Sequence, residues 1–278
     1  MSKTSVKIFT IQTFKEGQIE NKDDILVVEE PLEMRIRYGD LMNRKEMNLA
    51  ITMRTPGYDF ELVRGFLFTE GIIQSAQDII SIKYCINTKQ EEENNIVKIE
   101  LVESIQLNEH LFKRNFYMSS SCGVCGKSSI ESVMENCRLK IIQHKKFKAS
   151  LLLQLPELLR NEQISFKYTG GLHASALFNE DGKIIVLRED VGRHNALDKV
   201  IGASLEQNLQ DFGLILSGRV SFELMQKAAM AGIQLVCAIG APSSLAVEMA
   251  QEFNISLIGF LKQDKMNVYT GVERIQFE

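Results

Sequence analysis

The first part of the chain contains short stretches in which apolar and polar residues alternate, which is the spacing of a β-strand with one buried face. These stretches, some marked instead by β-branched residues, are 6–14, 25–28, 32–38, 46–54, 83–87 and 96–102. A helical spacing interrupts them over residues 59–69, and Gly71 suits the end of that helix. We therefore predict a strand-rich α+β domain over residues 1–115.

From about residue 165 the chain alternates between short apolar runs and amphipathic stretches. A β-hairpin is predicted over 172–178 and 183–188, because residues 179–182 have turn chemistry. Further strands are predicted at 213–216, 235–239, 255–261 and 266–270, and helices after residue 193 and at 222–230 and 244–252. This alternation is typical of α/β layers around a largely parallel sheet. We assign this α/β domain to residues 116–278.

Composition narrows the functional class without identifying it. The 278 residues are 45% hydrophobic and 24% charged, as in a globular protein with a substantial core. A formal net charge of -4 gives no general attraction to nucleic acid or to anionic membranes. Five cysteines without framework spacing, and a start without the apolar core of a signal peptide, favour reduced thiols in the cytoplasm.

One uncharged run, residues 228–247, is long enough to be tested as a membrane span. Gly232, Gln234, Gly240 and Pro242 interrupt it. It is better explained as the end of one helix, a strand, and a second helix with Pro242 in its first turn. We therefore predict a soluble protein without a membrane segment.

Two cysteines separated by two residues, Cys122 and Cys125, precede a predicted helix N-terminus. Ser128 and Glu131 match the capping-box pattern of such a terminus, and Lys127 adds a positive charge. Unsatisfied backbone N–H groups and a nearby cation both favour the thiolate over the thiol. The thiolate is the form that attacks sulfur and binds soft metals, so this pair predicts sulfur chemistry or metal binding.

Three other interpretations of this segment have weaker support. A zinc or rubredoxin-like iron site needs four ligands, whereas Cys85, Cys137 and Cys237 each stand alone in the sequence. A thioredoxin-like dithiol is expected near an early strand and helix, whereas this pair lies in the middle of the chain. A nucleotide P-loop needs a glycine where Ser121 stands. We expect no resident metal, and we expect Cys137, on the apolar face of the helix, to be a buried structural cysteine.

Polar residues follow several strands of the second domain. Their positions are Asp190, Arg193, His194, Ser217, Gly218, Arg219, Gly240, Ser243, Lys262 and Lys265. Parallel sheets bind ligands at the carboxyl ends of their strands, and helix N-termini with basic side chains suit a phosphorylated ligand. Three alternatives stay open: Gly218 only makes a turn, Arg219 pairs with a surface carboxylate, and His194 is structural.

Six long motifs occur in order and in register between Ser121 and Gly271, within a resemblance that runs over about residues 53–270. They are SCGVCGK, YTGGLHASALF, REDVGRHNALDKVIG, LSGRVSFELMQKAAMAG, APSSLAVEMA and IGFLKQDKMNVYTG. Together they resemble the FdhD/NarQ family of formate dehydrogenase accessory sulfurtransferases. Several long motifs in register are far more specific than one C-x-x-C.

The resemblance implies a cytoplasmic, homodimeric sulfur carrier whose second domain has a three-layer, cytidine-deaminase-like fold. A cysteine desulfurase would supply persulfide sulfur, and the carrier would deliver it to the molybdenum bis(molybdopterin guanine dinucleotide) cofactor. The sulfurated cofactor would then enter formate dehydrogenase. GDP would mimic the nucleotide part of this cargo.

The family's site residues fall on specific positions of this chain. The persulfide-bearing cysteine of the family motif falls on Cys122 and the second cysteine on Cys125. The guanine-dinucleotide segment falls on Phe260, Leu261, Lys262, Gln263, Asp264 and Lys265, and we add Arg219 as a phosphate ligand. Family members often carry a glycine-rich run with arginine here. This chain keeps the positive charge as lysine and loses bidentate arginine contacts.

Two further functional classes remain as alternatives. A zinc deaminase needs H-x-E and P-C-x-x-C, but His110, His144, His173 and His194 all lack the glutamate, and Ser121 precedes Cys122. The other alternative is a non-catalytic chaperone that only holds the cofactor, which would leave the two thiols without a role. The role of Cys125 also stays open: it either resolves the persulfide on Cys122 or only tunes that thiol.

Overall fold

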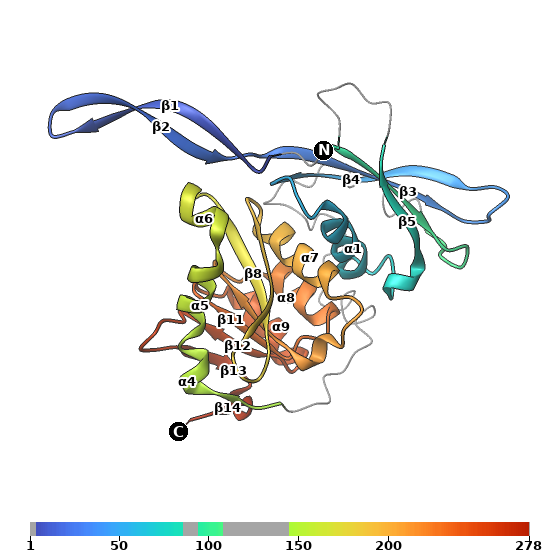
Figure 1. Cartoon of the computed structure of the whole chain (residues 1–278). Helices are drawn as coiled ribbons and strands as arrows, with labels where there is room; N and C mark the ends of the chain where they lie inside the picture. The colour runs from blue at the N-terminus through green and yellow to red at the C-terminus, as the bar shows by residue number, and fades with distance from the viewer. Residues whose placement is uncertain (1–3, 86–93, 108–144, 278) are drawn as a thin grey trace.

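The computed structural model describes residues 4–85, 94–107 and 145–277 (Figure 1). The C-x-x-C segment and the predicted domain boundary near residue 115 lie outside these ranges. None of the helices in the described part is both long enough and apolar enough to cross a bilayer.

A four-stranded sheet forms the body of the N-terminal part, with strand order β4-β3-β6-β5. Its strands are β3 (Glu30–Tyr38), β4 (Lys45–Arg54), β5 (Ile79–Tyr84) and β6 (Ile96–Leu101). Helix α1 (Asp59–Thr69) covers one face, and its Leu62 packs against alternate residues of β3 such as Met34. Strand β5 begins at Ile79, four residues before the predicted start.

Strands β1 (Val6–Lys15) and β2 (Gln18–Val27) form a separate two-stranded hairpin that extends away from the rest of the molecule (Figure 1). Glu16 and Gly17 connect the strands, and both have positive φ, as a tight hairpin turn requires. The sequence predicted only 25–28 in the second strand. The rest of this strand was missed because it contains polar residues such as Asn21 and Asp23. Neither face of the hairpin is buried in a core, so the strand does not need alternating apolar residues.

The second sheet has six strands in the order β13-β12-β11-β10-β8-β9. They are β8 (His173–Phe178), β9 (Ile184–Asp190), β10 (Gly213–Leu216), β11 (Leu235–Ala238), β12 (Ser256–Gly259) and β13 (Asn267–Thr270). Only β10, β11 and β12 run parallel to one another. The prediction of a largely parallel sheet was therefore wrong. The tight β8–β9 hairpin and the short return to β13 force antiparallel pairs, whereas helices connect the three central strands.

Helices cover both faces of this sheet, which gives three layers. One layer comprises α7 (Arg193–Ala203), α8 (Phe222–Met230) and α9 (Ser244–Glu252). The other contains α4 (Ala149–Leu152) and α5 (Leu155–Glu162), followed by α6 (Ile164–Thr169). Two short strands, β7 (Phe147–Lys148) and β14 (Ile275–Gln276), pair beside this second layer. The mixed α/β class is confirmed, and the cytidine-deaminase-like assignment stays a prediction.

Helices α1 and α7 join the two sheets. A Cβ atom at Gly202 would overlap the backbone oxygen of Glu61, so the two helix backbones touch where a side chain cannot fit. Nearby, the buried Lys227 of α8 lies 3.0 Å from Asp198 of α7 and donates to the Thr69 hydroxyl at 2.9 Å. This buried cluster fixes α1 against the helical layer of the six-stranded sheet.

Candidate functional site

The predicted sulfur-handling residues, Cys122 and Cys125, lie outside the described residues, and so does Cys137. Their roles therefore stay predictions. Cys237 of β11 is fully buried, and burial raises its pKa far above the ordinary range for a thiol. It remains a protonated packing group, so it is unsuited to carry sulfur.

The loops after β10, β11 and β12 lie side by side at one edge of the six-stranded sheet. The Gly240 amide donates to the Gly218 carbonyl at 3.0 Å, and the Phe260 amide donates to the Gly240 carbonyl at 3.0 Å. A Cβ atom on Gly240 would lie 2.8 Å from the Gly218 backbone, so this close approach requires glycine. The structure thus brings together the segments 217–219 and 260–265 that sequence analysis assigned to one edge.

The segment 260–265 forms a short exposed loop on this edge. Phe260 has a φ of 51° and is 42% exposed, whereas Leu261 is buried and anchors the loop. The Lys262 amide donates to the Lys265 carbonyl at 2.8 Å and closes the loop. The side chains of residues 262–265 are all exposed, and neither lysine has an ion-pair partner within the described ranges. Both ammonium groups are free to reach an anion.

A cavity of about 550 Å³ opens beside these loops, beneath α5 and α6. Its lining comprises Pro156, Arg160, Gln163, Phe166, Gly170, Gly171, Leu172, His173, Val191, Ser217 and Ile239. Of these, only Ser217 was assigned to the strand-end edge from the sequence, whereas His173 was considered only as a zinc ligand of the disfavoured deaminase. Gln263 of the exposed loop donates to Glu157 of α5 at 2.7 Å, which connects the loop to the helices that roof the cavity.

His173 lies in this cavity at the start of β8. Burial is the largest cause that lowers the pKa of His173, and the positive charges of Arg193 and Arg219 lower it further. The ring is therefore neutral at pH 7, and two guanidinium groups are close enough to act on it. Positive charge this close to a residue of the cavity favours an anionic ligand such as a phosphate.

Arg219 is exposed and forms no ion pair with any described carboxylate. The alternative that it pairs with a surface carboxylate therefore has no support within the described residues. Gly218, in contrast, does more than make a turn. Its carbonyl accepts a hydrogen bond from the Gly240 amide in the loop after β11, and a Cβ atom at Gly218 would contact the His173 ring.

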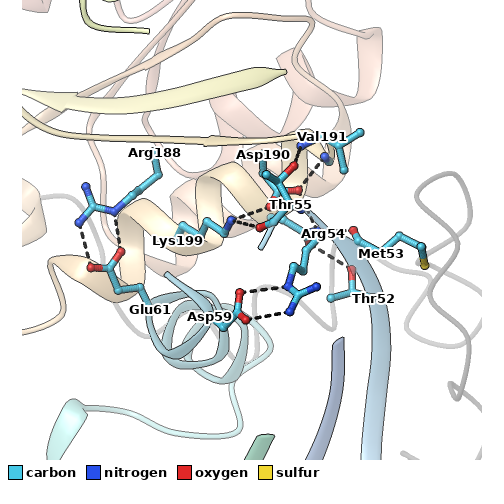
Figure 2. Close-up of polar contacts among 12 residues, drawn as sticks. Thr52, Met53, Arg54, Thr55, Asp59, Glu61, Arg188, Asp190, Val191 and Lys199 are labelled. Carbon is cyan, nitrogen blue, oxygen red and sulfur yellow. Dashed lines mark hydrogen bonds and ion pairs between the residues drawn. The ribbon is translucent and has the colours of Figure 1, made fainter. Parts of the chain in front are cut away.

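Asp190 does not face the cavity. Its carboxylate is fully buried, lies 2.7 Å from the Lys199 ammonium and accepts hydrogen bonds from the Thr55 and Gly192 amides (Figure 2). Lys199 also donates to the Thr55 carbonyl at 2.9 Å. Asp190 therefore fixes the six-stranded sheet to the end of β4, which is a structural role.

His194 also has a structural environment. Its Nε2 lies 3.5 Å from Glu223 and 3.5 Å from the Ser221 hydroxyl, which itself donates to Glu223 at 2.7 Å. Burial is the largest cause that lowers the pKa of His194, to about 4, so the ring is neutral at pH 7. These contacts favour a structural role for His194 over a role in ligand binding.

No cluster of three or more histidine, cysteine or acidic side chains suited to a metal occurs within the described residues. The expectation that no metal is bound at Cys122 and Cys125 is not tested by this finding and stays a prediction.

Comparison with known proteins places this arrangement in a family. A model described as the FdhD/NarQ family matches residues 27–276. A sulfur carrier protein FdhD from Mycolicibacterium paratuberculosis is 48% identical over 93% of this chain and 94% of its own. One from Picrophilus torridus is 42% identical over 91% of this chain and 92% of its own.

A crystal structure from Desulfotalea psychrophila, assigned as a formate dehydrogenase accessory protein, has a similar fold. Its TM-score is 0.75 at 21% sequence identity, with 98% of this chain and all of that chain covered. At this identity the likeness shows the fold alone. The family match and the identities above it show more: this chain belongs to the FdhD/NarQ family.

Proposed function

We propose that this protein is a cytoplasmic sulfurtransferase that accepts persulfide sulfur from a cysteine desulfurase on Cys122. It passes the sulfur to the molybdenum bis(molybdopterin guanine dinucleotide) cofactor before that cofactor enters formate dehydrogenase. Relatives named sulfur carrier proteins and a similar fold in a formate dehydrogenase accessory protein support this proposal. The resemblance also implies a homodimer, which we include in the proposal.

The sulfur step is a thiol–persulfide exchange. The Cys122 thiolate attacks the outer sulfur of the desulfurase persulfide, the sulfur–sulfur bond there breaks, and the desulfurase cysteine leaves as a thiolate. Cys122 then carries the persulfide. In one version, the Cys125 thiolate attacks the inner sulfur of Cys122, forms a disulfide and releases sulfide toward the cofactor. A cellular thiol must then reduce the disulfide. In the other version, Cys125 only tunes the acidity of Cys122, and a cellular thiol attacks the inner sulfur of Cys122, forms a mixed disulfide there and releases sulfide toward the cofactor. A second cellular thiol then reduces the mixed disulfide.

The observation that carries the cargo assignment is that cations gather on and near the adjoining loops after β10 and β12, which are both hydrogen-bonded to Gly240. Arg193 and Arg219 act on His173, and the loop of Lys262 and Lys265 lies on the same sheet edge. Each of the two molybdopterin guanine dinucleotide halves of the cofactor contains a pyrophosphate, so these cations suit the negative charge of the cargo. Charge-assisted phosphate contacts are each worth about 1.5–3 kcal/mol when sheltered from water.

A cofactor chaperone without sulfur chemistry is the alternative that experiment must separate. In cells that lack this protein, the wild type is expected to restore formate dehydrogenase activity, whereas Cys122→Ala is not. Purified Cys122→Ala is expected to bind GDP as tightly as the wild type. Full restoration of activity by Cys122→Ala would favour the chaperone over the sulfurtransferase.

A further inference from the structure

The β1–β2 hairpin, residues 6–27, carries an apolar surface that nothing in the described structure covers. Phe14 is 74% exposed, Ile19 is 67% exposed and Ile8 is 64% exposed. The hairpin projects away from both larger sheets (Figure 1). A two-stranded hairpin alone is at best marginally stable in water, so ten-residue strands with exposed apolar side chains indicate a surface that is covered in the working assembly. We call this hairpin the arm.

The strand register sorts the arm into two faces. Side chains of residues paired across the strands share a face, and alternate pairs share the same face. One face carries, from base to tip, the pairs Val6–Val27, Ile8–Ile25, Thr10–Asp23, Gln12–Asn21 and Phe14–Ile19. This face is apolar at both ends and polar in the middle. In its polar part the Thr10 hydroxyl donates to Asp23 at 2.9 Å.

This pattern is complementary to itself. Consider two arms stacked on this face and related by a two-fold axis beside the pair Ile11 and Lys22, which point to the opposite face. Ile8 then lies over the partner's Phe14, and Ile25 lies over the partner's Ile19. Asp23 lies over the partner's Asn21, so a carboxylate meets an amide donor. The apolar pairs Ile8–Ile25 and Phe14–Ile19 thus meet each other, and the polar pairs Thr10–Asp23 and Gln12–Asn21 meet each other, as a two-fold contact between identical surfaces requires. The Val6–Val27 pair instead meets the partner's turn at Glu16 and Gly17.

The surroundings of the arm extend the same contact. In this register the partner's turn reaches the Val6–Val27 pair at the base of the arm. Val27 lies against Gly171, directly after α6, where a Cβ on Gly171 would be 3.3 Å from its side chain. Helix α6 exposes two large apolar side chains, Ile164 and Tyr168, one turn apart. They continue the apolar area toward the roughly 800 Å² per partner that stable dimers bury.

We infer that the arm mediates dimerisation, with the arms of two copies stacked antiparallel through the face that carries Ile8 and Phe14. This inference rests on the homodimer included in the proposed function and identifies its contact surface. Binding of a different protein would not require the two ends of one arm to match each other across a polar centre, whereas stacking of two identical arms does.

Sedimentation velocity of the full chain at micromolar concentration tests the inference first. The wild type is expected to sediment as a dimer. Phe14→Asp is expected to weaken the dimer at least tenfold, because it places a carboxylate against the partner's Ile8, and the side chain is too exposed to be needed for folding. Met42→Asp is the matched control, because Met42 is 95% exposed outside the arm; it is expected to remain dimeric. A monomeric wild type, or a Phe14→Asp variant that stays fully dimeric, overturns the inference.

Cross-linking tests the register. Co-expressed Ile8→Cys and Phe14→Cys chains are expected to form a disulfide between positions 8 and 14, identified by peptide mass so that native cysteines do not confuse the result. Phe9→Cys with Phe14→Cys is the control, because Phe9 lies on the opposite face. A cross-link in the control and none in the test pair contradicts the register. Sulfur loading of Phe14→Asp, measured in the same samples, tests the proposed function separately from the dimer.

Discussion

The loop of residues 260–265 offers the sharpest test of the cargo site. We expect Lys262→Ala combined with Lys265→Ala to weaken GDP binding by at least about tenfold. Both lysines are exposed on the edge that carries Arg219, and neither has an ion-pair partner within the described residues. GDP carries two phosphates, so we assume that each of the two lysines contacts one phosphate.

The magnitude follows from the exposure of these lysines. A sheltered charge-assisted contact is worth about 1.5–3 kcal/mol, but solvent screening reduces the value for an exposed ammonium group. We therefore assign about 0.7 kcal/mol to each lysine, which gives about 1.4 kcal/mol for both, or one factor of ten in affinity. Because the contacts are electrostatic, the difference between variant and wild type is expected to shrink at high salt.

Isothermal titration calorimetry with GDP measures this difference directly. Lys83→Ala combined with Lys183→Ala is the matched control, because it removes the same charge from exposed positions on β5 and beside the opposite edge of the six-stranded sheet. Cys122→Ala is a second control, because the thiol is proposed to handle sulfur and not to bind the nucleotide. Unchanged GDP affinity in the Lys262 and Lys265 double variant, or an equal loss in the lysine control, refutes the assignment of this loop.

Two further predictions concern the cavity and the helix contact. Arg219→Gln is expected to raise the pKa of His173, because it removes one of the two positive charges that help burial to hold that pKa low; an NMR pH titration in which the pKa stays constant contradicts this. Gly202→Ala is expected to destabilise the protein by roughly 2–3 kcal/mol, because the added methyl meets the rigid backbone of α1 at Glu61. Urea denaturation measures the loss, and it must exceed that of Ala203→Gly, which is expected to cost at most about 1 kcal/mol.

The residues that gather at the strand-end edge of the six-stranded sheet were predictable because the sequence pattern that marks them is local. Each polar group directly follows a short apolar strand, as Ser217 follows β10 and Gly240 follows the strand ending near Ile239. The carboxyl ends of parallel strands meet at one edge, so their loops had to meet there as well. The directions of β8, β9 and β13 were not predictable from alternation, because short hairpin returns and helical crossovers both leave apolar runs in sequence.

The cavity was missed for a different reason. Helices α5 and α6 are eight and six residues long, too short for helical periodicity to stand out in the sequence. Arg160 and Phe166 therefore carried no recognisable signal. Arg193 comes close enough to His173 to lower its pKa because β8 and β9 pair with His173 opposite Asp190, three residues before Arg193.

Asp190 shows how a local pattern misleads. It follows a strand, as a ligand-binding residue of the edge would, yet it binds Lys199 and the Thr55 amide from the other sheet. The partner that decides its role is 135 residues away in sequence. Only tertiary structure could separate this structural carboxylate from the residues that face the cavity.

The central claim is that Cys122 carries sulfur, and intact-mass spectrometry after incubation with a cysteine desulfurase and cysteine tests it most directly. The wild type is expected to gain about 32 Da for each added sulfur atom, and the gain is expected to disappear on treatment with a thiol reductant. Cys137→Ala is expected to load normally and Cys122→Ala not at all. Sulfur that loads on Cys122→Ala, or that maps to Cys137 in the wild type, would contradict the account.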